Sequence, residues 1–141
     1  MFLFVSIQEL LCSLKSYFNV PNPSSGKNPF DDVDPYAWYG KAVLWAVEKG
    51  ITNGMSDSEF GTEMTCTRAQ VATFLWRAQG QPAPKASSNP FHDVDTSAWY
   101  GKAVLWAVEN GVTNGMGEGI FAPDGTCTRG QIVTFMYRAI V

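Results

Sequence analysis

The sequence predicts an all-α protein made of two helix-loop-helix units in tandem. The 141-residue chain repeats itself: residues 28–80 align with residues 89–141 without a gap, and roughly 33 of 53 paired positions are identical. In each copy, apolar residues recur at helical spacing, and no alternating strand pattern competes with them. Each copy should therefore form two helices joined by a loop.

The first helix of each copy is expected at residues 35–49 and 96–110. In the first copy Asp34 can cap the helix, Pro35 suits its first turn, and Gly50 suits a left-handed stop. One apolar stripe of this helix consists of Trp38, Ala42, Trp45 and Ala46. This stripe should face the protein core.

The second helix of each copy is expected to begin at Thr67 and at Thr128. Thr67 with Gln70, and Thr128 with Gln131, fit the capping box, in which each side chain bonds the other residue's backbone amide. The loop before this helix is rich in glycine and small polar residues, and Phe60 should anchor it in the core.

Arg68 and Arg129 occupy the first turn of these second helices, where the helix dipole disfavours a cation. The other two arginines, Arg77 and Arg138, lie near helix ends, where a cation is favoured. An exposed arginine can lay its stem along the surface at little cost. Alternatively, these positions could bind an anion such as a carboxylate or phosphate. The helix start has free backbone amides, and the guanidinium would be free to meet an anion from outside.

Residues 1–27 resemble a degenerate half repeat followed by a linker. Shifting the repeat interval backward places Ser6 opposite Thr67 and Ile7 opposite Arg68. This segment should keep a serine cap but bind no anion. Residues 81–88, with two prolines and small polar residues, are expected to be an exposed linker between the copies.

Composition narrows the function classes. The net charge of −3 and the pI near 5.0 argue against general binding to nucleic acid or to an anionic membrane. The N-terminal segment resembles neither a secretory signal nor a transmembrane helix. Three cysteines without a C-x-x-C pair, Cys12, Cys66 and Cys127, indicate neither a disulfide framework nor a zinc site. No metal or cofactor is expected.

The motifs of each copy resemble the S-layer homology (SLH) repeat. In order, "NPFDDVDPYAWYGKAVLWAVEKGITNGM" and "CTRAQ" parallel the family's F-x-D-V, W-Y, A-V-x-x-A, G-I-x-x-G and I-T-R-A-E elements. Cysteine replaces the isoleucine before Thr67, glutamine replaces the glutamate, and the first copy has "FGT" where the second has "FAP". The cysteine should be a small buried hydrophobic residue, and the glutamine preserves the cap.

The resemblance implies a non-catalytic module of an extracellular, cell-surface protein. Such repeats typically form a pseudo-trimer that binds cell-wall polysaccharide attached to peptidoglycan, often through pyruvylated or otherwise acidic sugars. The arginine of the motif is then the main contact, which assigns this role to Arg68 and Arg129. Supporting ligand contacts implied by the same matching are Trp38, Trp99, Asp32, Asp93, Gly54, Met55, Gly115 and Met116.

Each supporting residue also has a structural explanation. The tryptophans fit a core stripe better than a sugar platform, the aspartates can brace the chain entering the first helix, and the glycines can serve backbone geometry.

Two other functions compete with sugar binding. The repeats could form a structural or self-assembly module, including a homo-oligomer that completes the missing repeat. An enzyme is disfavoured, since the only histidine, His92, matches Asp31 in the other copy.

Overall fold

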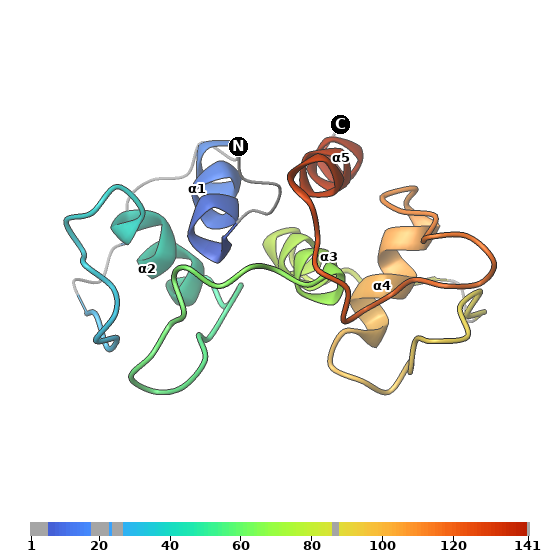
Figure 1. Ribbon diagram of the computed structural model, residues 1–141, viewed down its shortest axis with the longest axis horizontal. Helices are drawn as coiled ribbons and strands as arrows, with labels where there is room; N and C mark the ends of the chain where they lie inside the picture. Colours follow the sequence, from blue (N-terminus) through green and yellow to red (C-terminus); the bar gives the residue numbers. More distant parts are fainter. Residues whose placement is uncertain (1–5, 18–22, 24–26, 86–87, 141) are drawn as a thin grey trace. The chain divides into compact units, whose positions relative to one another are not determined.

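The computed structural model describes residues 6–17, 23, 27–85 and 88–140. These residues divide into two compact units, residues 6–65 and residues 66–140. Five helices, shown in Figure 1, are α1 (Ile7–Tyr17), α2 (Gly40–Glu48), α3 (Arg68–Ala78), α4 (Gly101–Glu109) and α5 (Arg129–Ile140). In these ranges the only β-type pairing consists of isolated bridges, so the all-α prediction is confirmed.

Helix packing within each unit crosses the boundary of the sequence repeat. In the first unit α1 packs on α2, and in the second unit α3 packs on both α4 and α5 (Figure 1). By sequence α3 closes the first copy, whereas α4 opens the second copy. A packing unit therefore joins the second helix of one copy to the first helix and loop of the next.

The second helices are capped as predicted. Thr67 Oγ1 accepts a hydrogen bond from Gln70 N (3.1 Å), and Gln70 Oε1 accepts one from Thr67 N (2.9 Å). Thr128 and Gln131 make the same pair of bonds, at 3.2 and 3.0 Å. Ser6 also accepts from the amide of Glu9 (3.3 Å) and donates its own amide to the Glu9 carboxylate (3.0 Å). The expected serine cap of the N-terminal segment is thus present.

The first helices begin later than predicted, at Gly40 and Gly101 instead of residues 35 and 96. Asp34 does not cap α2, because its carboxylate accepts from the amide of Tyr36 in a separate turn (2.9 Å). A Cβ on Gly40 would lie only 2.5 Å from the Asp34 carbonyl oxygen, so the preceding turn folds tightly back on the helix start. A continuous helix from residue 35 would not allow this close approach.

The apolar stripe predicted for the first helix is partly wrong. Trp45 is 4% exposed and belongs to the core, whereas Trp38 is 65% exposed and Trp99 is 58% exposed. Each exposed indole packs edge-on against the following tyrosine, Tyr39 or Tyr100. The core role predicted for Trp38 and Trp99 fails because the turn before each helix displaces them from its face.

The loop between α4 and α5 is anchored by Phe121, as Phe60 anchors the equivalent loop of the first copy. Both rings are buried, and Phe121 packs with Ala72, Phe91, Val94 and Val104 in one cluster. This cluster joins α3, α4 and the loop, which positions the loop against the start of α3.

Cys66 and Cys127 are fully buried free thiols, in agreement with the predicted hydrophobic role. In the described ranges, no helix has both the length and the apolar character needed to cross a bilayer.

Candidate functional groove

Arg68 is the centre of the candidate site, although its side chain is not exposed as the sequence suggested. It is 3% exposed. Its Nε donates a 2.7 Å hydrogen bond to the Phe121 carbonyl oxygen, and its guanidinium lies over the rings of Phe121 (4.9 Å) and Phe135 (5.2 Å). These contacts hold the planar group in one orientation.

The surroundings of Arg68 shift the pKa of its guanidinium in opposite directions. Burial lowers the pKa of its guanidinium, and the nearby Cys127 and Asp93 act in the opposite direction. Phe121 O is the one acceptor that the described chain provides for this side chain. The terminal nitrogens are therefore available to an external acceptor.

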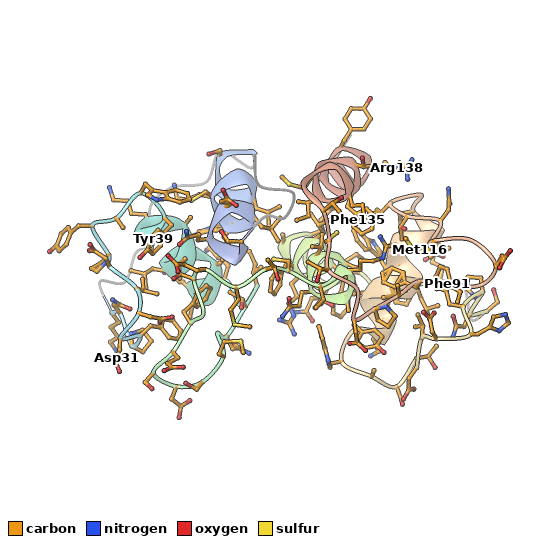
Figure 2. The ribbon with its side chains drawn as sticks, viewed as in Figure 1. Asp31, Tyr39, Phe91, Met116, Phe135 and Arg138 are labelled. Atoms are coloured by element: carbon orange, nitrogen blue, oxygen red, sulfur yellow. The ribbon has the colours of Figure 1, made fainter. Side chains whose placement is uncertain are left out.

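A polar groove with a volume of about 530 Å³ opens beside Arg68. One wall is the loop after α4, and the other is α5 with its cap; Figure 2 shows Met116 on the loop, and Phe135 and Arg138 on α5. The lining residues are Arg68, Thr113, Asn114, Gly115, Met116, Thr128, Gln131, Thr134, Phe135 and Arg138. Among them are two arginines and no acidic residue, so the groove favours an anion.

The loop wall is held by backbone geometry. Gly115 has φ +83°, and a Cβ there would lie 2.5 Å from Phe91 Cε1. Its amide donates to Thr113 Oγ1 (3.0 Å), and the Met116 amide donates to the Ile120 carbonyl oxygen (2.7 Å). The glycine thus has the predicted structural role, and it also keeps the groove wall free of a side chain.

Asp93 braces the same loop from its other side. Its two carboxylate oxygens accept from the amides of Phe121 (2.9 Å) and Ala122 (2.8 Å). Asp32 does the same for Phe60 (2.8 Å) and Gly61 (2.7 Å) in the first copy. Slight burial raises the pKa of each carboxyl, but the backbone hydrogen bonds outweigh this effect and lower it.

Asp32 and Asp93 thus have a structural role, but they hold the loop before the second helix, whereas the sequence suggested bracing of the chain that enters the first helix. The backbone of Phe121 is thereby held on both sides: its N–H donates to Asp93, and its carbonyl oxygen accepts from Arg68.

The structure brings together only part of the predicted ligand set. Arg68 of the first copy lines the groove with Gly115 and Met116 of the second copy. Trp99 and Asp93 belong to the same unit but do not line it. The remaining first-copy candidates lie in the other unit: Trp38, Asp32, Gly54 and Met55.

Arg129 is the first residue of α5, but its side chain lies outside the described residues. Its role in binding stays a prediction.

Arg138 is the charged groove residue that was not predicted from the sequence. A cation is favoured near the C-terminal end of a helix, so the position of Arg138 gave no reason to expect a ligand there. The available signal was spacing: Gln131, Thr134, Phe135 and Arg138 follow the i, i+3, i+4, i+7 pattern of one helix face. The capping glutamine marks which face turns toward the groove.

The fold and groove define a class, the tandem-repeat helical modules in which one copy completes the site of the next. The family model for the S-layer homology domain matches residues 29–72 and 90–133, which is more than half of the chain. The chain belongs to the S-layer homology domain family.

Relatives place the module in surface proteins. A "Cell surface protein" of Thermoanaerobacter kivui is 34% identical over 116 residues, which are 79% of this chain and 15% of the relative. A "Surface-layer 125 kDa protein" of Lysinibacillus sphaericus is 32% identical, over 85% of this chain and 10% of the relative. A "Cellulosome-anchoring protein" of Acetivibrio thermocellus is 28% identical, over 79% and 24%.

The chain thus spans a quarter or less of the length of these relatives. Family and relatives together indicate an extracellular location at the cell surface and a role in anchoring there.

Proposed function

We propose that the groove binds an acidic or pyruvylated sugar of a cell-wall polysaccharide attached to peptidoglycan, and so anchors the protein non-covalently. The observation that carries this proposal is the setting of Arg68. Its guanidinium is fixed by the Phe121 carbonyl and two aromatic rings, and it lines a groove without carboxylates. A planar cation with free donors suits a carboxylate through paired hydrogen bonds.

The rest of the groove fits a sugar. Asn114 and Thr128 offer amide and hydroxyl groups for sugar hydroxyls, and exposed Met116 offers an apolar contact. Arg138, exposed on α5, supplies a second positive charge. The remaining residues predicted from the family motif stay candidate contacts: Arg129, whose side chain lies outside the described residues, and Trp38, Trp99, Asp32, Asp93, Gly54 and Met55.

Co-sedimentation with purified wall sacculi tests the proposal. Met116→Asp places a carboxylate in the groove at an exposed position, and retention should fall at least tenfold because two anions repel each other. Tyr137→Asp is the matched control: it adds the same charge at an exposed position of α5 outside the groove lining, and should leave retention unchanged. Equal retention of both variants would contradict anion binding here.

Arg68→Met adds a second test. It removes the charge but keeps an apolar stem over Phe121, and it should abolish retention while the helical circular dichroism persists.

Self-assembly is the alternative function, and light scattering separates it from wall binding. A mass that increases with protein concentration in the absence of wall polymer would favour assembly. A constant mass together with retention on sacculi would favour anchoring.

A further inference from the structure

Cys66 and Cys127 face each other across a short antiparallel pairing. Thr67 and Thr126 form an antiparallel bridge, flanked by hydrogen bonds from Cys127 N to Cys66 O (2.8 Å) and from Arg68 N to Gly125 O (2.8 Å). In this register Cys66 lies directly opposite Cys127. Opposite residues of an antiparallel pair carry their side chains on the same face.

The Cα separation of such a pair is compatible with a disulfide, and closing the bond requires the two Cβ atoms to approach each other by about 1 Å. Cys66 and Cys127 make one of the two backbone hydrogen bonds of a hydrogen-bonded pair, in which the Cα atoms are typically about 5.5 Å apart. This separation lies inside the range of roughly 4.4–6.8 Å found for disulfides. Both thiols are fully buried; burial raises the pKa of Cys66, and Cys127 raises it further. Both side chains are therefore buried on the same face of the pairing.

The chemistry of the pair depends on when an oxidant can reach it. Burial raises the pKa of Cys66 to about 12 and that of Cys127 to about 11, although Arg68 lowers the latter, so the closed structure holds two unreactive thiols. During folding they are exposed and have ordinary pKa values. An extracellular protein folds where disulfides form and persist.

We propose that Cys66 and Cys127 form a disulfide when the protein folds in an oxidising compartment. One thiolate attacks a small-molecule disulfide such as oxidised glutathione and releases one glutathione thiolate. The other cysteine thiolate then displaces the second glutathione from the mixed disulfide. Two cysteine thiols are oxidised and one glutathione disulfide is reduced to two thiols, which take up the two protons that the cysteines lose.

The bond would join the start of α3, which carries Arg68, to the start of α5, which forms one wall of the groove. Cys66 immediately precedes the cap of α3, which carries Arg68, and Cys127 immediately precedes the cap of α5. The covalent link would hold the starts of both helices together.

Thiol titration of the full chain tests the proposal. The reduced, unfolded protein is refolded in a glutathione redox buffer, and free thiols are then counted in denaturant. The count should fall from three to one, with loss of two hydrogens by mass and a tryptic peptide joining Cys66 to Cys127. The oxidised form should melt roughly 10 °C or more above the reduced form.

Variants identify the partners. Cys66→Val and Cys127→Val should each leave every remaining thiol free, whereas Cys12→Ser should still form the bond. Three free thiols after refolding, or a bond that includes Cys12, would overturn the proposal. The same count on protein secreted into an oxidising compartment gives an answer that does not depend on refolding.

Discussion

Asp93→Asn tests how strongly the loop that carries Phe121 is held. The Asp93 carboxylate accepts from two successive amides, those of Phe121 (2.9 Å) and Ala122 (2.8 Å). Asparagine keeps one carbonyl oxygen but replaces the other with an NH₂ group, which would point a donor at a donor. One of the two loop amides therefore loses its acceptor.

The size of the effect follows from the bonds that change. A hydrogen bond to a charged group contributes about 1.5–3 kcal/mol, and the surviving bond to a neutral amide contributes about 1 kcal/mol. Because Asp93 is exposed, solvent screening reduces the charged contribution. We expect the free energy of unfolding of this unit to fall by roughly 2 kcal/mol, which corresponds to a melting temperature about 10 °C lower.

Urea unfolding followed by tryptophan fluorescence measures this loss. Asp124→Asn is the matched control, because Asp124 lies exposed in the same loop and should give a change within roughly 0.5 kcal/mol. If Asp93→Asn unfolds like the wild type, the bracing argument is refuted. If the Asp93→Asn variant is as stable as the wild type but is no longer retained on wall sacculi, Asp93 contacts the ligand instead.

Three further predictions concern the stability of the fold: its dependence on pH, the cap of α3 and the backbone geometry at Gly115. The pKa values of Asp32 and Asp93 are lowered by folding, so the stability they contribute is present above the unfolded pKa of about 4 and is lost as pH falls through their folded pKa values; acid titration of the wild type should show this loss. Thr67→Ala removes a capping acceptor and should cost about 1 kcal/mol in urea unfolding, with a loss below 0.3 kcal/mol contradicting the cap. Gly115→Ala combines a left-handed backbone with a clash against a phenylalanine ring and should cost at least 2 kcal/mol. Gly111→Ala, also left-handed but in open space, should cost only about 1 kcal/mol, and equal losses for the two would contradict the clash.

Local chemistry made the caps and loop anchors predictable. Thr67 with Gln70 forms a capping box from residues three positions apart, and the structure reproduces it in full. Phe60 lies in a polar glycine-rich segment, where a lone aromatic residue has few other places to pack. Such features depend on neighbours in sequence, and a single chain contains that information.

Features that depend on distant contacts were not predictable in the same way. The exposure of Trp38 follows from a turn that Gly40 allows, and the helical spacing alone concealed it. The burial of Arg68 follows from Phe121 and Phe135, which belong to the other sequence copy. The repeat pattern identifies equivalent residues in the two copies, but it does not show which copy supplies the residues that pack against Arg68.

The crossing of repeat boundaries by the helix packing has a practical consequence for dividing this chain. The exposed segment after α3 offers an obvious cutting site, but α3 and α4 pack across it, so a protease nick there would leave the two fragments held together. Removing all residues before residue 81 would instead remove α3, the helix that covers Phe121, and with it Arg68, one of the two arginines that line the groove. The unit that can be transplanted into another protein with its site intact therefore starts near Cys66, inside the first copy.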